Sequence, residues 1–214
     1  MKVFKFKKRK KYPEVTLRTI IKGYDITPEQ FKWIATHQKL TESFIEEYVD
    51  RFALEDVYKH HFLSEAFIEK YIDRCNPLTW RIISVHQQLS EQFIEKHSDK
   101  LDWYEISIHQ SISEEFAMKH SDKIMWFEFI TKKYLKEENM RTLIDVLDED
   151  SILACFKRKY VSEDFIKENI NRLCMARRYR LFFHMLDNKY DQSKINIAKE
   201  SIENDGFAQE KRSH

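Results

Sequence analysis

One short pattern recurs along the sequence, and this internal repeat limits the possible folds more than any other feature. Five copies read LTESFIEEYVDR, LSEAFIEKYIDR, LSEQFIEKHSDK, ISEEFAMKHSDK and VSEDFIKENINR. They occupy residues 40–51, 63–74, 89–100, 112–123 and 161–172. Their phenylalanines, 44, 67, 93, 116 and 165, are separated by 23, 26, 23 and 49 residues. The last gap has room for one degenerate copy, in which we expect Met140 to replace the phenylalanine near position 139.

A second series of large apolar residues keeps the same register. Its members are Phe31, Leu54, Trp80, Trp103, Trp126 and Ile152, spaced by 23, 26, 23, 23 and 26 residues. Because both series share the same irregular spacing, each repeat contains two linked elements, and the three-residue insertions fall between them.

Both elements have the features of short helices. The first begins at a capping residue followed by Glu, at Thr41, Ser64, Ser90, Ser113 and Ser162. The second begins near the Trp position, where Thr27 with Gln30 and Asp102 with Glu105 match a capping box. Its fifth residue is usually small (Ala35, Ser84, Ser107), which lets helices approach closely.

Such helices, about nine residues long, are marginal in isolation and become stable by stacking on neighbouring repeats. The sequence therefore predicts an all-α, solenoid-like array of two-helix repeats with a basic N-terminal arm. The chain has only two glycines and three prolines, which disfavours many-turned β folds. Since Gly23 and Gly206 stand alone, no phosphate-binding glycine loop exists.

We divide the chain into three segments. Residues 1–22 form the basic arm, within which 15–22 fits either a strand or a helix. Residues 23–187 form the repeat array, which opens with an unpaired second helix at 27–38. Residues 188–214 form a C-terminal helix and, from Gly206, a frayed tail.

The string SEQFIEKHSDKLDWYEISIHQ (90–110) resembles the short tandem helical repeats of mostly uncharacterised proteins from bacteriophages and large DNA viruses. The resemblance covers roughly residues 26–175 and supports the all-α array. It implies a viral or phage origin, and the abundance of Lys, Ile, Phe, Tyr and Asn agrees with an AT-rich genome. The degenerate copy at 135–160 departs from the pattern.

Histidines and glutamines recur with the repeat. Equivalent residues of stacked repeats lie roughly 8–10 Å apart, too far to share a metal whose ligands sit about 2 Å from it. We therefore predict no metal site from the recurring His37, His60, His86 and His109, and packing roles for the core-facing His97 and His120. Gln38, Gln87 and Gln110 fall on the buried stripe, so we expect each to bond backbone groups of the adjacent turn.

The remaining polar residues give no catalytic signature, so we predict a non-enzymatic protein without a cofactor. The acids Asp50, Asp73, Asp99 and Asp122 recur once per repeat, as helix-end caps or surface ion pairs would. The three cysteines form no paired motif and are expected to act as small hydrophobes in a reducing compartment. Trp80, Trp103 and Trp126 are expected to pack in the core rather than stack on bases.

The charge is distributed unevenly. Residues 1–22 hold nine Lys or Arg and one acid, so the arm carries +8 and the rest of the chain −7. The arm can neutralise phosphates, which makes nucleic-acid or acidic-partner binding one hypothesis. Its candidate residues are Lys2, Lys5, Lys7, Lys8, Arg9, Lys10 and Lys11. The clusters Lys157-Arg158-Lys159 and Arg177-Arg178-Arg180 add a second positive region.

The leading hypothesis is a protein that binds another macromolecule, a protein partner first, along the array face. The candidate contacts are the variable positions Tyr104, Glu105, Phe127 and Glu128, which we expect to be exposed. The viral resemblance extends this to inhibition of a host defence or regulatory protein. We find no secretory signal and no run of 18 apolar residues, and expect a location in the host cytoplasm or, in a eukaryote, the nucleus.

Overall fold

The computed structural model describes residues 4–7 and 10–210, and within these ranges it contains helices and no strands. It separates into two compact units, residues 1–113 and 114–214, each described by itself. The α-helices of the first unit are α1 (Glu14–Gly23), α2 (Pro28–His37), α3 (Glu42–Glu47), α4 (Leu54–His60), α5 (Glu65–Lys70), α6 (Pro77–His86), α7 (Glu91–Lys96) and α8 (Trp103–His109). The predicted all-α array of short helix pairs is confirmed.

The second unit contains α9 (Glu114–Lys119), α10 (Trp126–Lys132), α11 (Glu137–Leu143), α12 (Glu149–Phe156), α13 (Glu163–Asn169), α14 (Met175–Asp187) and α15 (Gln192–Glu210). Short 3-10 turns follow three of the first helices, at Val49–Arg51, Ile72–Arg74 and Ile170–Arg172.

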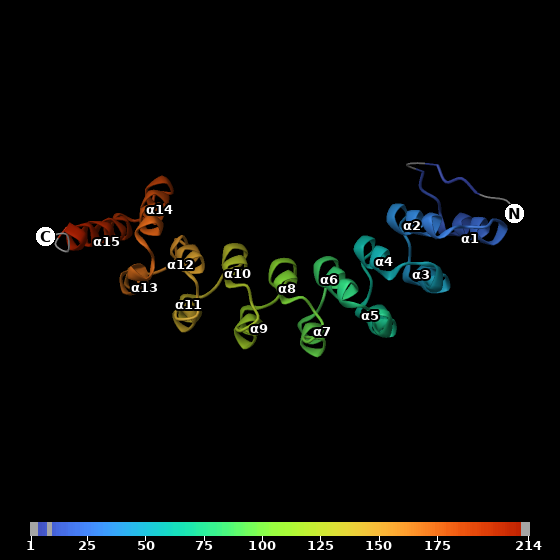
Figure 1. The fold of residues 1–214 in the computed structure, drawn as a ribbon, viewed down its shortest axis with the longest axis horizontal. Helices are drawn as coiled ribbons and strands as arrows, with labels where there is room; N and C mark the ends of the chain where they lie inside the picture. Colours follow the sequence, from blue (N-terminus) through green and yellow to red (C-terminus); the bar gives the residue numbers. More distant parts are fainter. Residues whose placement is uncertain (1–3, 8–9, 211–214) are drawn as a thin grey trace. The chain divides into compact units, whose positions relative to one another are not determined.

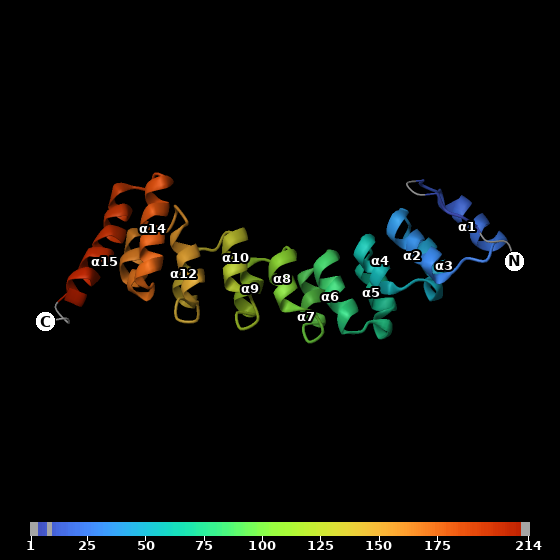
Figure 2. The same ribbon diagram turned by 45° about the horizontal axis from the view of Figure 1, so that its top comes forward.

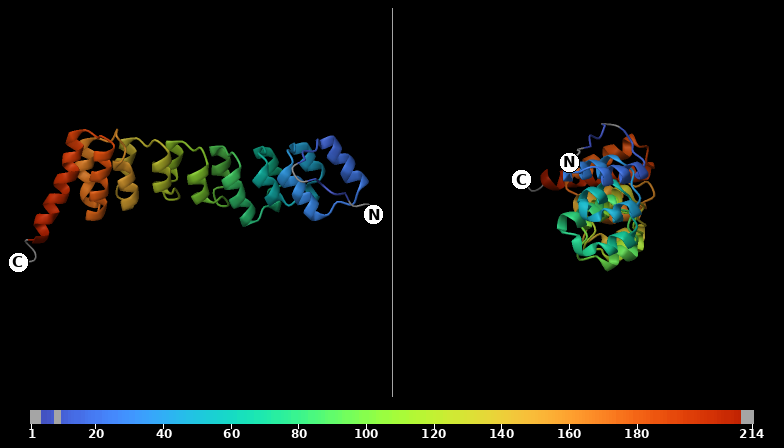
Figure 3. Two further views of the ribbon diagram at one scale, coloured as in Figure 1. Left: turned by 90° about the horizontal axis from the view of Figure 1, so that it is seen from above. Right: turned by 90° about the vertical axis from the view of Figure 1, so that its right-hand side faces the viewer.

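The helices of each unit lie in two rows. In the first unit, the second helices α2, α4, α6 and α8 pack side by side, and α3, α5 and α7 form the other row (Figure 1). In the second unit α10 packs on α12 and α12 on α14, while the C-terminal helix α15, red in Figure 3, packs along α14 and α13.

The two apolar series form the core between the rows. Phe44, Phe67, Phe93 and Phe165 are buried, and Met140 is fully buried in the degenerate copy, as its position in the repeat predicts. The small residues Ala35, Ser84 and Ser107 are also buried. Trp80 and Trp126 are buried in the core, as expected, whereas Trp103 is only half-buried. The Trp103 and Trp126 indole N–H groups donate to Ser98 O and Ser121 O.

A glutamate at the start of each first helix links consecutive repeats. The Glu65 carboxylate accepts from the backbone N–H of Ser90, at 2.5 Å, and from its hydroxyl, while the same hydroxyl caps α7 by accepting from Phe93 N. Equivalent bonds join Glu42 to Ser64, Glu91 to Ser113 and, in the second unit, Glu137 to Ser162. Within a unit, such a bond attaches one first helix to the N-terminus of the first helix that follows it.

A glutamine at the end of α2, α6 and α8 makes the complementary link. The Gln110 amide N–H₂ donates to Ser84 O and Gln87 O at 2.8 and 2.7 Å, and its oxygen accepts from Leu89 N at 3.0 Å. Gln87 and Gln38 are equally buried and bridge backbone groups in the same way. The predicted role of the buried glutamines is confirmed.

At the end of α4 the equivalent residue is His61, and in the second unit cations from other positions bind the equivalent carbonyls. The His61 Nε2–H donates to Ala35 O at 2.7 Å. Arg158 donates to Ile130 O and Lys133 O, the carbonyls at the same repeat positions that Gln110 uses. Lys194 donates to Lys159 O at 2.8 Å. The bridging group thus changes from neutral to charged between the two units.

At the N-terminus, the structure shows residues 15–22 within the helix α1, beside α2 in Figure 2. The expectation of an unpaired second helix at 27–38 is wrong, because Glu14 accepts from Thr41 N at 2.6 Å as the other first-helix glutamates do. Arg18 pairs with Glu47 at 2.6 Å, a cross-repeat ion pair like Lys70 with Glu46. Pro13 stands at the N-cap of α1, where most of the other first helices have Ser or Thr, so the sequence pattern did not identify α1 as the first helix of a repeat.

At the C-terminus, α15 continues past Gly206 to Glu210, where a frayed tail was expected. A single glycine in a helix costs only about 1 kcal/mol, and Ala208, Gln209 and Glu210 after it are good helix formers.

We predict that Gln110→Ala destabilises the protein by about 2 kcal/mol, because three buried backbone groups lose their partner. The melting temperature, followed by circular dichroism, should fall by about 4–8 °C, since each kcal/mol corresponds to roughly 2–4 °C in a chain of this size. Gln88→Ala, at an exposed neighbouring position, is the matched control. An unchanged melting temperature of Gln110→Ala would refute the role of this amide.

We also predict that His61→Gln makes the protein less sensitive to acid. Burial lowers the pKa of His61, so its contribution to stability is complete above about pH 6.5 and is lost as the pH falls through the folded-state pKa. Glutamine, the residue of the equivalent positions, does not titrate. The drop in melting temperature from pH 7 to pH 5 should be smaller in His61→Gln than in the parent or in His60→Gln, an exposed neighbour. Equal drops would contradict the assignment.

Candidate partner-binding surface

The four predicted array-face residues differ in their exposure. Tyr104 on α8 is 50% exposed and Phe127 on α10 is 43% exposed, as expected. Tyr104 and Glu105 belong to the first unit, whereas Phe127 and Glu128 belong to the second.

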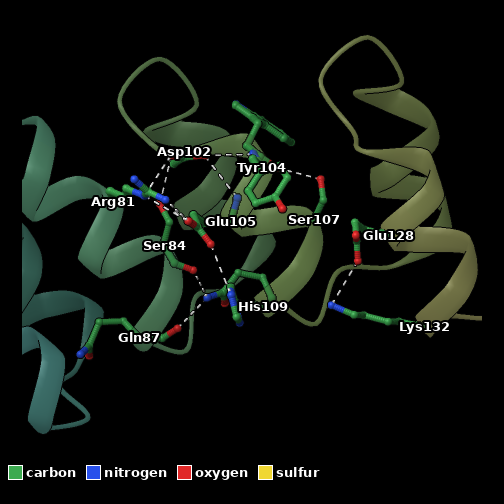
Figure 4. A network of polar contacts seen from close by, with 12 residues as sticks. Arg81, Ser84, Gln87, Asp102, Tyr104, Glu105, Ser107, His109, Glu128 and Lys132 are labelled. Carbon is green, nitrogen blue, oxygen red and sulfur yellow. Dashed lines mark hydrogen bonds and ion pairs between the residues drawn. The ribbon is translucent and has the colours of Figure 1, made fainter.

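Glu105 is buried, so the expectation that it is an exposed contact is wrong. Its carboxylate accepts from the Arg81 guanidinium of the preceding repeat at 2.8 and 3.0 Å, and lies 3.3 Å from His109 Nε2 (Figure 4). Asp102 caps α8 by accepting from Tyr104 N and Glu105 N. Glu105 therefore joins α6 to α8 and is not available to a partner.

Glu128 is half-buried and pairs with Lys132, one turn later on α10, at 3.5 Å (Figure 4). Its side chain keeps partial exposure. A surface pair of this kind contributes little to stability, so both groups can exchange partners at low cost.

Phe127 lines a pocket of about 300 Å³ in the second unit. The apolar part of the lining comes from Phe127 on α10 and from Leu153 and Ala154 on α12. The polar part is Thr131, Asp150, Lys157, Arg158 and Arg180. Leu153 and Ala154 are nearly buried, so the pocket has an apolar floor, an aromatic wall and a rim with three cations.

The charges of this rim are unevenly compensated. Asp150 is held by two hydrogen bonds from Arg177, at 2.9 and 3.0 Å, and these bonds lower the pKa of the Asp150 carboxyl. Arg158 is bound to backbone carbonyls, which do not neutralise it. Lys157 and Arg180 make no ion pair with a described residue. The pocket thus offers an apolar surface next to positive charge.

The sequence pointed to Phe127 but missed the residues that complete the pocket. Leu153 follows Ile152 as Phe127 follows Trp126, so both occupy the same repeat position on adjacent helices. This equivalence, with the cluster Lys157-Arg158-Lys159, was the available signal. The other predicted cluster is largely structural, since Arg177 pairs with Asp150 and Glu149, and buried Arg178 donates to backbone carbonyls.

The described part of the basic arm is attached to α2 rather than extended. The Phe6 ring stacks on Trp33 with centroids 4.8 Å apart, Phe4 contacts Phe6 and Tyr24, and Gln30 donates to Phe4 O. Lys5, Lys7, Lys10 and Lys11 remain exposed, with Lys11 donating to His37 O. Lys2, Lys8 and Arg9 lie outside the described residues.

The other predicted residues have mostly structural surroundings. His97 and His120 are buried and pack on Phe93 and Phe116, and His97 also lies 2.8 Å from Glu69. Among the described residues, no group of three potential metal ligands occurs. Cys155 is buried, and burial raises its pKa to about 12, but Cys174 is exposed, which the sequence did not predict.

No family model, curated protein or solved structure matches this chain. In the part of the chain that the structure describes, none of the helices has the length and apolar character needed to cross a bilayer.

Proposed function

We propose that the protein is a non-enzymatic helical-repeat binding protein whose second unit holds an acidic segment of a partner protein in the Phe127 pocket. The observation that carries this proposal is the combination of an apolar floor with a rim of three cations, none of which forms an ion pair with a described residue.

The chemistry of the pocket selects its occupant. An apolar side chain of the partner would displace water from Phe127 and Leu153, which stabilises the complex by roughly 25 cal/mol per Å² of apolar surface buried. A neighbouring carboxylate of the partner would meet Lys157 and Arg180. Their charges would also accelerate association and make binding weaken with salt.

The same groups argue for binding rather than catalysis. Asp150, the carboxylate found among the described residues of the pocket lining, is held by Arg177, so it is a poor general base. Viral or phage origin, inhibition of a host protein and a location in the host cytoplasm or nucleus remain hypotheses that rest on the resemblance of the repeat string.

We predict that Phe127→Ala and Arg180→Gln each weaken binding of an acidic probe peptide by about tenfold. The probe is a 12-residue peptide in which leucines alternate with glutamates, labelled with fluorescein and titrated by fluorescence anisotropy. Removal of one well-packed aromatic ring or one charged group from an interface costs about 1–2 kcal/mol, and 1.4 kcal/mol is a factor of ten.

Tyr104→Ala is the matched control, because Tyr104 occupies the equivalent repeat position in the first unit and is similarly exposed. Its binding should equal that of the parent. Binding that is absent, or that Phe127→Ala and Arg180→Gln leave unchanged, would exclude the pocket. Affinity purification from the native host, with and without nuclease, then identifies the partner.

A second candidate function is nucleic-acid binding by the basic arm. The specific observation is that Phe4 and Phe6 attach the arm to the first repeat while the lysines between and after them stay exposed. A fixed row of cations loses less entropy on binding a phosphate backbone than a free tail does.

For this function we predict that a variant with Lys5, Lys7 and Lys10 changed to Gln binds duplex DNA more weakly and with a flatter salt dependence. The slope of log K against log salt should fall by about 0.9 for each phosphate that the variant no longer neutralises. Mobility-shift titrations at several KCl concentrations measure both. Phe4 and Phe6 are retained so that the arm stays attached. An unchanged slope would remove the arm from consideration.

A further inference from the structure

Three turns of the second unit meet along one edge, which we call the basic edge. It comprises Lys132 at the end of α10 with Lys133, Tyr134 and Lys136 after it, Lys157, Arg158, Lys159 and Tyr160 after α12, and Tyr190 after α14. Arg158 donates to Lys133 O at 3.4 Å, Tyr160 donates to Leu135 O at 2.9 Å, and Tyr190 donates to Lys157 O. These bonds hold the turns against one another.

The basic edge carries concentrated positive charge. Segments 131–136 and 157–160 contain six Lys or Arg and no Asp or Glu. Lys132 pairs with Glu128 and Lys136 lies 4.0 Å from Glu138, both through exposed, exchangeable contacts. Lys159 lies over the Tyr190 ring at 5.8 Å, and Arg158 binds only carbonyl oxygens among described groups. Carboxylates therefore compensate only part of the charge.

Two tyrosine rings protrude from this charged edge. Tyr134 is 63% exposed and Tyr160 is 41% exposed, and their ring centroids are 4.7 Å apart at an interplanar angle of 38°. The Tyr160 hydroxyl bond to Leu135 O fixes the position of its ring. At the same repeat position the first unit has Lys39, Phe62, Gln88 and Ser111, so it has no comparable ring pair.

We propose that the basic edge binds single-stranded nucleic acid. Exposed aromatic rings stack on unpaired bases, whose faces are covered in a duplex, and adjacent lysines neutralise the phosphates between them. An acidic peptide would use the cations but not the faces of the two rings. The site goes beyond the protein-binding function proposed above, and its contacts other than Lys157 and Arg158 lie outside the Phe127 pocket.

The test is a fluorescence-anisotropy titration of labelled oligo(dT) and oligo(U), 12 nucleotides long, with the full chain at several KCl concentrations. Tyr134→Ala should weaken binding by about tenfold, the effect expected for one stacked base, while Tyr134→Trp should restore it. Lys159→Gln should reduce the slope of log K against log salt by about 0.7, the value for one neutralised phosphate of a single strand.

Three controls separate this site from the others. Tyr104→Ala removes an equally exposed tyrosine from the first unit, Phe127→Ala alters the pocket, and the arm variant Lys5, Lys7, Lys10→Gln alters the other cationic segment. Tyr104→Ala and Phe127→Ala should bind the oligonucleotides like the parent. In the arm variant, Tyr134→Ala should still weaken oligonucleotide binding by about tenfold, because the arm and the basic edge are separate sites. Duplex DNA of equal length, titrated with the arm variant, should bind more weakly than the single strands.

Three results would overturn the proposal. One is the lack of oligonucleotide binding at low salt, and another is parent-like binding by both Tyr134→Ala and Lys159→Gln. The third concerns a polyglutamate probe with the same charge as the oligonucleotide. If this probe displaces the oligonucleotide, and if Tyr134→Ala weakens binding of both by the same factor, the edge binds an acidic protein instead. Circular dichroism of each variant confirms folding, and the Tyr134→Trp rescue distinguishes stacking from a structural defect.

Discussion

The structure depends on side chains that bond the open ends of short helices in the neighbouring repeat. An α-helix leaves four N–H and four C=O groups unpaired at its ends, so a helix of six residues, such as α5 or α7, satisfies few of its own backbone groups. The Glu65 carboxylate takes the N–H of Ser90, and the Gln110 amide takes the last carbonyls of α6. Each repeat is therefore complete only when its neighbours are present, which makes stacking a condition of folding rather than its consequence.

This arrangement leaves other positions free to vary. The residue after the Trp-series position is Lys32, Glu55, Arg81, Tyr104, Phe127 or Leu153 in successive repeats, and the core does not depend on its type. Arg81 forms the bond to Glu105 there, whereas Phe127 lines a pocket. The same repeat position thus supplies a structural ion pair in one repeat and part of a pocket wall in another, so its role is set by the neighbouring repeat.

The same dependence on neighbours decides what the sequence could predict. The spacing of the repeat predicted the helix pairs and the burial of Met140. The position of Gln110 on the buried stripe predicted its hydrogen bonds to the backbone. Both predictions succeeded because these features recur at the same position in successive repeats. The exposure of Glu105 was predicted wrongly because its partner Arg81 lies 24 residues earlier in the sequence. The sequence showed only the local capping pattern of Glu105 with Asp102. The first helix α1 escaped detection because Glu14 alone keeps the motif. The ring pair of Tyr134 and Tyr160 requires two turns to be adjacent, which spacing suggests only once the stacking geometry is known.

Replacement of a neutral bridge by a cation links the architecture to the charge of the second unit. Gln110 and Arg158 serve equivalent carbonyls, so the backbone requirement is met in both cases. The substitution adds a positive charge that the fold itself does not need, and Lys194 adds another at the next repeat. Because carbonyl oxygens satisfy these cations without neutralising them, their field extends to the adjoining surface. An anionic partner at that surface would gain from charges already fixed in place, so less entropy would be lost on its binding than with freely rotating surface lysines.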